Sequence, residues 1–202
     1  MKCYVYRVAR DFGFAPNPFN GYCTLATCKP RIRNVAIPGD WVIGTGSVQY
    51  DAVGMLIFAM EVTEKVTFNQ YWEDVRFQCK KPVMNGSLKR AFGDNIYFRD
   101  DTGNWIQADS HHSLNDGIPN SKNIQKDTQS NFVLISSNFT YLGKNYEPIP
   151  EEILEKIRIV RNHRTITVVN DIAQIIDWLI QYEKGFIADP NQFNNFQRYN
   201  GN

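Results

Sequence analysis

Residues 53–62 read VGMLIFAMEV and contain the longest apolar run of the chain. The run has no polar face, which is typical of a strand buried on both sides of a sheet. It is also much shorter than the ~18 consecutive apolar residues that a membrane-spanning helix needs. We therefore expect residues 53–62 to form the central strand of a sheet.

Other segments rich in β-forming residues predict further strands around this centre. They are residues 3–8, 41–46 and 132–136. The second of these ends in two glycines, which would allow close approach of backbone or ligand. Residues 95–98 and 105–108 flank a DTGN turn and predict a hairpin. Residues 68–72 look like a short helix or turn.

The pattern becomes helical after residue 150. From Ile172 to Ile180, apolar side chains recur with the spacing of one helix face. We expect Asn170 to cap the N-terminus of this helix and Gly185 to end it. A preceding helix should begin after Pro150, with two glutamates in its first turn.

The predicted fold class is α+β: a mostly antiparallel sheet or small barrel, with helices added at the C-terminus. A chain of 202 residues is the length of one domain with at most an appendage. We expect residues 1–146 to form a β-rich domain and residues 147–202 a helical extension packed on it. The asparagine-rich residues 189–202 are expected to fray.

Charge and composition exclude some function classes. The 22 Lys and Arg against 21 Asp and Glu leave a net charge of +1, which argues against binding nucleic acid by bulk electrostatics. A local basic patch stays compatible with this balance. The polar start MKCYVYR does not resemble a signal peptide, so we expect a cytoplasmic location with four reduced cysteines.

Residues 11–33, DFGFAPNPFNGYCTLATCKPRIR, have no hydrophobic period. Segments this long without a period are commonly functional or disordered, and the aromatic residues and prolines here favour order. Two interpretations stay open: a loop facing a ligand, or an arm wrapped across the sheet. Lys29, Arg31 and Arg33 suit contact with a phosphate or carboxylate, and equally a solvated charge cluster.

The sequence motifs for catalysis and metal binding are weak. Cys23 and Cys28 are five residues apart and lack a second pair of ligands, so we predict no metal site and no cofactor. A catalytic cysteine would need a base that only the fold can supply. Residues 109–113, DSHHS, contain every member of a hydrolytic triad, but adjacency in sequence is not geometry. Residues 44–47, GTGS, lack the rest of a phosphate-binding fingerprint.

Several segments together resemble the nucleotide-modification-associated domain family, in its second type. They are residues 6–33, 38–46 (PGDWVIGTG), 74–82 (DVRFQCKKP), 92–98 (FGDNIYF) and 132–143 (FVLISSNFTYLG). Members of that family are associated with modified DNA bases in phages and bacteria. The resemblance implies a nucleotide or nucleic-acid context and carries no reaction or catalytic residue set.

The order of the segments also resembles the PUA-like barrels of the EVE and ASCH kind. In those barrels a Gly-Asp turn, here Gly39-Asp40, opens a strand beside a base-binding pocket. An aromatic-acidic segment at residues 68–74 and a basic-proline segment at residues 80–82 follow in the same order. This resemblance implies a small barrel with a base pocket.

A protein that reads a single base needs an aromatic face, polar groups for the base edge and a few cations for the flanking phosphates. The aromatic candidates are Phe14, Phe19, Tyr22 and Trp41. The edge-reading candidates are Asn17, Thr24, Asp40, Thr45 and Ser47. The phosphate candidates are Lys29, Arg31 and Arg33. Asp40 could equally cap a turn, and Trp41 could equally belong to the core.

Three hypotheses for function follow. The favoured one is a binding module that recognises a modified nucleobase or nucleotide, free or within DNA. The second is an enzyme acting on a nucleotide or modified base, marked by a perturbed pKa beside a nucleophile. The third is a phage–host conflict protein that sequesters a signalling nucleotide or blocks a host protein. The polar residues that the enzyme hypothesis would bring together are Asp11, Thr24, Cys28, Asp40, Asp109, His111 and His112.

Overall fold

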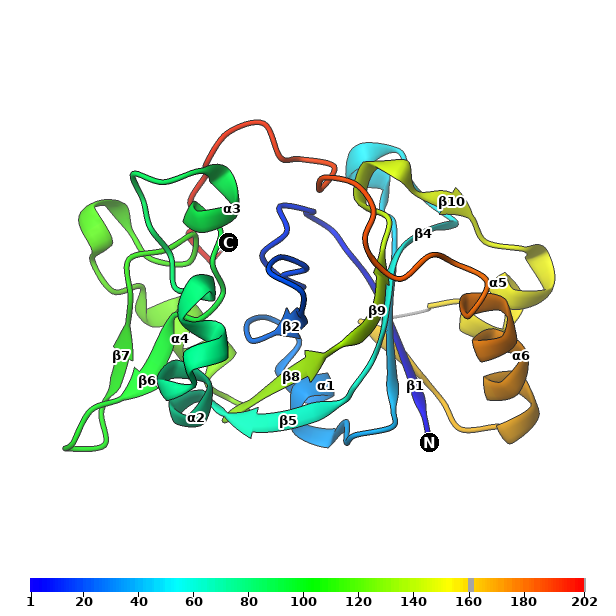
Figure 1. The fold of residues 1–202 in the computed structure, drawn as a ribbon, viewed down its shortest axis with the longest axis horizontal. Helices are drawn as coiled ribbons and strands as arrows, with labels where there is room; N and C mark the ends of the chain where they lie inside the picture. Colours follow the sequence, from blue (N-terminus) through cyan, green and yellow to red (C-terminus); the bar gives the residue numbers. More distant parts are fainter. Residues whose placement is uncertain (160–161, 202) are drawn as a thin grey trace.

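A seven-stranded sheet forms the middle of the molecule (Figure 1). The computed structural model describes residues 1–159 and 162–201. Six strands follow one another in the order β11-β1-β3-β4-β9-β12, and β10 pairs with β4. Their bounds are β1 (Cys3–Arg7), β3 (Trp41–Thr45), β4 (Met55–Glu61), β9 (Asn138–Tyr141), β10 (Glu147–Pro148), β11 (His163–Ile166) and β12 (Gly185–Phe186).

Strand β4 is the central strand, as the apolar run predicted. It pairs antiparallel with β3, β9 and β10, and Leu56, Ile57 and Phe58 are fully buried. Two pairs in this sheet, β1 with β3 and β9 with β12, are parallel. The boundary expected at residue 146 stays a prediction, although the three strands that follow it are hydrogen-bonded into this same sheet.

Two smaller antiparallel sheets lie beside the main one. The first has the order β2 (Cys23–Leu25), β8 (Phe132–Ser136), β5 (Glu64–Thr67). The second is the predicted hairpin of β6 (Tyr97–Arg99) and β7 (Trp105–Gln107). The α+β class with a mostly antiparallel sheet is confirmed, and within the described residues no sheet closes into a barrel.

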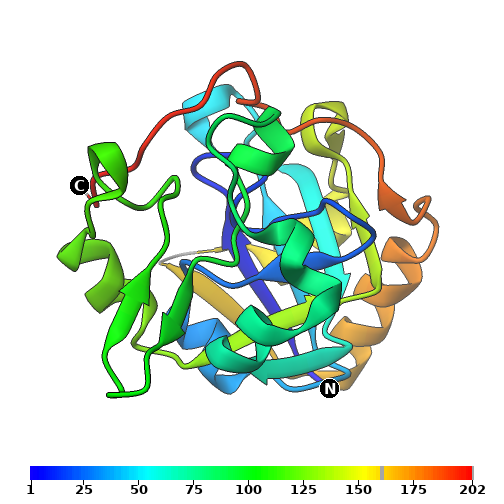
Figure 2. The same ribbon diagram turned by 60° about the vertical axis from the view of Figure 1, so that its left-hand side comes forward.

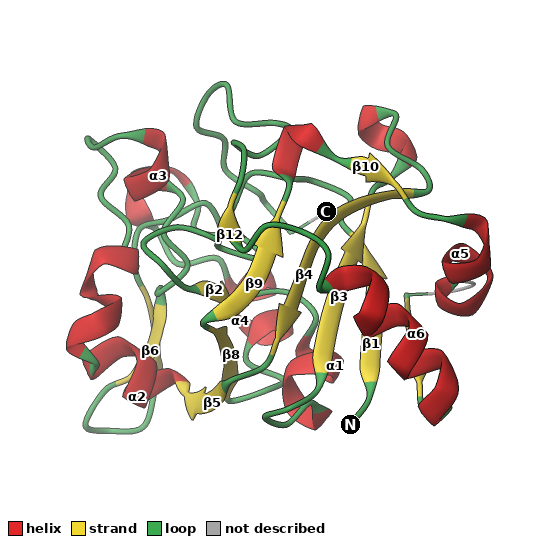
Figure 3. Ribbon diagram, turned by 45° about the vertical axis from the view of Figure 1, so that its right-hand side comes forward, coloured by secondary structure: helices red, strands yellow, loops and turns green. Residues whose placement is uncertain are grey.

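Helices α5 (Glu151–Ile157) and α6 (Val169–Leu179) cover one face of the main sheet (Figure 3). Helix α5 begins after Pro150, as predicted. Helix α6 has no side-chain cap at its N-terminus, and Asn170 lies inside it, so the predicted cap was wrong. Gly185 does not end α6 either, because it starts strand β12 instead.

The remaining helical segments are short and lie in the connections between strands. The α-helices are α1 (Pro30–Val35), α2 (Phe68–Glu73), α3 (Leu88–Ala91) and α4 (Ser121–Asp127). The 3-10 turns are η1 (Val48–Tyr50), η2 (Val75–Lys80), η3 (Asn115–Gly117) and η4 (Gly143–Asn145). No helix within the described residues has the length and apolar character needed to cross a membrane.

The core has three parts that follow these layers. Residues such as Ile43 and Ala59 pack under α5 and α6 on one face of the main sheet. Tyr6 and Phe58 pack with Leu134 of β8 on the other face. A third cluster, rich in aromatic rings, lies between the β2-β8-β5 sheet, α2 and the β6-β7 hairpin.

The C-terminal tail is held on the surface rather than frayed, which corrects the prediction for residues 189–202 over the described part of that range. The tail crosses from the α6 end of the molecule to the hairpin end (Figure 2). Phe193 and Phe196 contact the ring of Phe92. The backbone N–H of Tyr199 donates to the carbonyl of His111 at 2.7 Å. These contacts with the buried ring of Phe92 offset the entropy cost of ordering the tail.

Gly46 at the end of β3 permits the close backbone approach expected of it. A Cβ there would lie 2.0 Å from the backbone oxygen of Ala52. We predict that Gly46→Ala lowers the free energy of unfolding by at least about 2 kcal/mol, because the backbone must shift. Gly103→Ala is the control: its φ of +84° is unfavourable but its Cβ would meet no atom within 4 Å. It should cost about 1 kcal/mol. Equal losses in urea denaturation would contradict the prediction.

Candidate functional site

The long loop after β1 is ordered and packs against the sheet. Its Asp11 carboxylate is buried and accepts from the backbone N–H of Asn191 at 2.9 Å and from the hydroxyl of Tyr141. Burial raises the pKa of Asp11. Phe19 turns away and packs on Phe186 and Phe193. Part of the loop therefore packs as an arm on the sheet and part of it lines a cavity, while its contact with a ligand stays a prediction.

That cavity has a volume of about 670 Å³. The end of β1, the loop residues Phe12 and Phe14, the start of α1, the end of α4 and Tyr199 of the tail form its walls. A cavity of this size is in the range that holds small organic ligands. Segments far apart in the sequence thus meet around one hollow.

The lining of this cavity is basic and aromatic. Five lysines and arginines line it, and among the described lining residues none is an aspartate or glutamate. The cations are Arg7, Arg10, Lys29, Arg31 and Lys126. The aromatic rings are Tyr6, Phe12, Phe14 and Tyr199, with His111, His112 and His163 beside them. Such a lining favours a ligand with both an anionic and an aromatic part.

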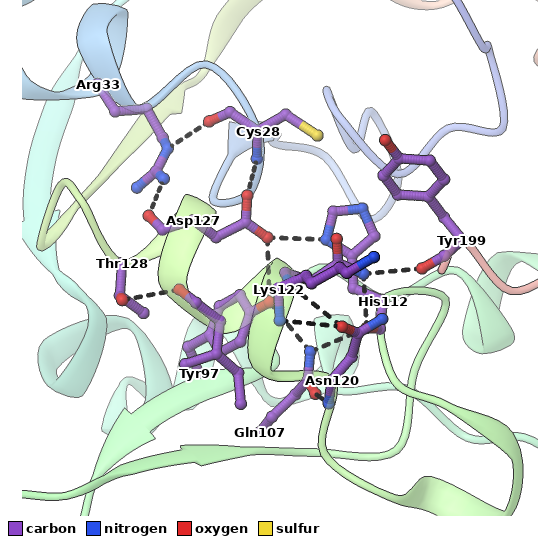
Figure 4. A network of polar contacts seen from close by, with 12 residues as sticks. Cys28, Arg33, Tyr97, Gln107, His112, Asn120, Lys122, Asp127, Thr128 and Tyr199 are labelled. Atoms are coloured by element: carbon purple, nitrogen blue, oxygen red, sulfur yellow. Dashed lines mark hydrogen bonds and ion pairs between the residues drawn. The ribbon is translucent and has the colours of Figure 1, made fainter. Parts of the chain in front are cut away.

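The carboxylate of Asp127, at the end of α4, binds Cys28 and His112, two lining residues that form the floor of the cavity (Figure 4). Oδ1 accepts from the backbone N–H of Cys28 at 2.7 Å. Oδ2 lies 2.7 Å from Nδ1 of His112 and accepts from the hydroxyl of Tyr97 at 3.0 Å. Asp127 is 1% exposed and His112 is 3% exposed. Water is therefore largely excluded from this ion pair.

Asp127 sets the charge of His112. Burial alone would lower the pKa of His112, but the charge and hydrogen bond of Asp127, together with a side-chain hydrogen bond to Cys28, raise it to about 10. Burial likewise opposes ionisation of Asp127, yet His112 and Arg33 keep the pKa of that carboxyl below its usual value. His111 is the opposite case, because burial and the charge of His112 lower its pKa to about 3. Two adjacent histidines thus differ in charge at neutral pH.

The backbone at Cys28 is held in a left-handed conformation. Cys28 has φ 55° and Lys29 has φ 38°, which non-glycine residues rarely adopt. The guanidinium of Arg33 donates from Nε to the carbonyl of Cys28 at 2.8 Å and from Nη1 to the carbonyl of Phe132 at 2.6 Å. It also donates to the carbonyl of Asp127. Arg33 is fully buried, and these hydrogen bonds tie the Cys28 loop to β8 and to the end of α4. We call this arrangement the Arg33 clamp.

Comparison with known proteins then places the chain. The model of one family, nucleotide modification associated domain 2, matches residues 1–197. This chain belongs to that family. Searches of the curated proteins and of the solved structures found no significant match. The family links this nucleotide modification associated domain to nucleotide or DNA modification, and its cavity is considered below in that context.

Three of the twelve candidate nucleotide-binding residues line the cavity of this nucleotide modification associated domain. They are Phe14, Lys29 and Arg31. Of the residues considered for an enzyme, Cys28, His111 and His112 line it. Across the described residues, no three His, Cys, Asp or Glu side chains gather as a metal site.

The other candidates lie elsewhere, and most have partners within the protein. Arg33 is the buried clamp described above. Asp40 accepts from the backbone N–H of Lys2 at 2.8 Å and of Ile37 at 3.1 Å, and Trp41 packs in the core under α6. Ser47 accepts from the backbone N–H of Gln49 at 3.3 Å, capping η1. Tyr22 packs on Phe77, Phe19 packs on the tail, and Thr45 is buried. Their role in binding stays a prediction.

Asn17 and Thr24 belong to a buried polar cluster around Asp94 and Lys80. Asn17 Oδ1 accepts from Lys80 Nζ at 2.7 Å. Thr24 and Tyr71 donate their hydroxyls to Asp94 at 2.7 and 2.8 Å. These four side chains and Tyr71 are each at most 1% exposed. Because Thr24 lies in β2 and Tyr71 lies in α2, the shared bonds to Asp94 hold β2 and α2 together.

Sequence reasoning missed Arg10, Lys126, Asp127 and Tyr199. Helix α4, SKNIQKD, has one large apolar residue and so carries no amphipathic signal. Tyr199 lies in a segment whose composition indicated fraying. The run of polar residues ending at Asp127 offered no spacing that connects it to Cys28, 99 residues away.

The Asp94 cluster predicts a pH-dependent stability. Burial raises the pKa of Asp94 from 3.8 to about 6, against the opposing effects of Lys80 and the Thr24 and Tyr71 hydroxyls. The folded state therefore holds the proton more tightly than the unfolded state. Between pH 3.8 and about 6 this group makes the free energy of unfolding fall as pH rises, by up to about 3 kcal/mol.

In Asp94→Asn this contribution is absent. The free energy of unfolding of the variant, relative to the native protein, should therefore increase from about pH 4 to about pH 6. Urea denaturation of both proteins at the two pH values measures this change, and the other titrating groups cancel in the comparison. A constant difference would show that Asp94 titrates near its ordinary value.

Proposed function

We propose that this nucleotide modification associated domain binds a nucleotide or a modified nucleobase in the basic, aromatic cavity. The observation that carries the proposal is the lining itself: five cations, four aromatic rings and three histidines, with no acidic residue among the described lining side chains. The family membership supplies the nucleotide context. This proposal keeps the binding module as the favoured function and assigns it a place.

The rim of the cavity suits the phosphate. Arg7, Arg10, Arg31 and Lys126 are exposed, so a phosphate can replace water around them without a large desolvation cost. Local charge of this kind also explains how a protein with a net charge of +1 can attract an anion. A few contacts to one or two phosphates are enough for a mononucleotide.

The inner walls suit the base. Lys29 Nζ lies 4.5 Å from the ring centroid of Tyr6, and the Arg10 guanidinium lies 4.7 Å from that of Tyr199. Both rings thus present a face toward the cationic side of the cavity. A base that stacks on either ring would leave its phosphate near the cation that the ring now contacts.

An enzyme acting on the same ligand is the second candidate. The observation that favours it is the nucleophilic side chain of Cys28 beside His112, whose pKa is raised to about 10 by Asp127 against the effect of burial. A perturbed group beside a nucleophile in a cavity is typical of catalytic sites. The binding proposal does not depend on this chemistry.

Charge reversal at the rim tests the binding proposal. We predict that Arg31→Glu with Lys126→Glu weakens the binding of deoxynucleoside monophosphates, measured by calorimetry at low salt, by roughly 10- to 100-fold, because charge-assisted contacts are lost. The matched control is Lys89→Glu with Lys184→Glu, which changes the net charge equally at exposed lysines outside the cavity. The control should bind like the native protein.

The ligand panel should include free and cyclic nucleotides and short DNA with and without modified bases. A ligand at ~100 times its dissociation constant stabilises the fold by roughly 2.7 kcal/mol, which thermal shift detects. If none of these ligands binds at low salt, or if both double variants bind alike, the proposed site is wrong.

A further inference from the structure

Cys28 is a half-buried thiol that lines the cavity, and an imidazole and a carboxylate lie near it. Cys28 and His112 both line the cavity, and Asp127 binds both: Oδ1 accepts from the backbone N–H of Cys28 at 2.7 Å, and Oδ2 lies 2.7 Å from Nδ1 of His112. Figure 4 shows the sulfur on the same side of Asp127 as the imidazole ring. Since Nδ1 is engaged by Asp127, proton exchange with the thiol would use the second ring nitrogen, Nε2.

We infer that Cys28 is a catalytic nucleophile for acyl transfer, with His112 as the acid and base of the reaction and Asp127 as the residue that positions His112. The same three roles, nucleophile, base and orienting acceptor, recur in acyl-transfer enzymes on unrelated folds. Asp127 also accepts the backbone N–H of Cys28, so one carboxylate aligns nucleophile and base together.

The other cysteines lack this environment. Cys3 and Cys23 are fully buried, and burial raises the pKa of both thiols, that of Cys3 to about 12. Cys79 is half-buried, but its sulfur contacts the carbonyl of Arg76 at 3.3 Å, and it does not line the cavity. Cys79 is therefore a thiol of similar exposure that serves as an internal control.

The backbone around Cys28 supports the assignment. Two consecutive non-glycine residues, Cys28 and Lys29, are held in the left-handed region by the Arg33 clamp and by Asp127. Such conformations are unfavourable and persist where the surrounding structure enforces them, commonly at functional sites. Here the enforced turn presents the thiol to the cavity rather than to the core.

The chemistry balances without an oxidant or a metal ion as reactant. In the reacting form the proton of the thiol already resides on His112, and the Cys28 sulfur attacks the carbonyl carbon of an ester, thioester or amide. The C–S bond forms, the bond to the leaving group breaks, and the leaving group takes the proton from His112. Water or an amine then attacks the thioester and gives a proton to the neutral His112, the C–S bond breaks, and the sulfur returns to its starting form beside the protonated imidazole.

The substrate class rests on the proposed function, whereas the nucleophile does not. A cavity with five cations and four aromatic rings would take an acylated nucleotide or nucleobase. The acyl group would have to reach Cys28 on the floor while the phosphate meets the cationic rim. The reaction would add an acyl group to the nucleotide or remove one from it, depending on which acceptor attacks the thioester.

The test uses the full chain and p-nitrophenyl acetate as the acyl donor. We expect a burst of about one equivalent of nitrophenolate, with the acetyl group located on Cys28 by peptide mass spectrometry. Cys28→Ala should abolish both, and Cys79→Ala should leave both unchanged. His112→Gln should slow acylation of Cys28 at least about 100-fold.

The test of Asp127 needs a readout other than rate. Asp127→Asn keeps an oxygen for the Cys28 N–H but removes the charge that binds His112. We expect slower acylation together with loss of the low-field proton resonance of the His112 Nδ1–H. Because substitution of His112 or Asp127 can also unfold the chain, the fold of both variants is checked by circular dichroism.

Iodoacetamide labelling of the native protein gives a measurement that needs no variant. Cys28 should be alkylated at least tenfold faster than Cys79.

Equal labelling of Cys28 and Cys79, or no acetyl group on Cys28, would overturn the inference. The two proposals fail separately. If Cys28 is acylated but no nucleotide binds, only the nucleotide-binding proposal fails. If nucleotides bind to the native protein and to Cys28→Ala but Cys28 shows no preferential reaction, the cavity is a binding site without this chemistry.

Discussion

The geometry of the cavity depends on one buried carboxylate. Asp127 is bound by the loop after β2 through Cys28, by the hairpin through Tyr97, and by the segment before α4 through His112. An ionised carboxylate without partners would be too costly to bury, so these three contacts must form together. The same contacts close the floor of the cavity. The interaction that stabilises this junction therefore also determines where the thiol and the imidazole lie.

The neighbouring histidines show how environment divides two identical side chains. His112 faces Asp127, which raises its pKa, while His111 is surrounded by Phe12, Phe14 and Phe92, and burial lowers its pKa. One therefore carries a proton at neutral pH and the other does not. This division allows His111 to form part of the aromatic wall while His112 serves the polar floor.

The cationic residues near the loop divide in a similar way. Arg33 looked like a phosphate contact beside Lys29 and Arg31, but it lies fully buried and binds backbone carbonyls. Lys29 and Arg31 face the cavity. Their alternation follows from α1, since Arg33 lies two residues beyond Arg31 on a helix and so points to a different face. The sequence shows three cations close together, and only the helix geometry shows that their side chains face different surroundings.

The sequence by itself determined elements with a clear local signal: β4 from its apolar run, the hairpin of β6 and β7 from its turn, and α6 from the period of its apolar face. These elements are encoded locally, because burial on one or both faces imposes a period on neighbouring residues. The sequence of the long loop, with the other segments quoted above, also indicated the family. Only the tertiary structure decided that Tyr199 of the tail lines the cavity, that Asn17 and Thr24 join a buried cluster, and that Asp127 binds both Cys28 and His112. Contacts between residues far apart in the chain, such as Cys28 and Asp127 at 99 positions, leave no period in the sequence, so the candidate site arises from packing.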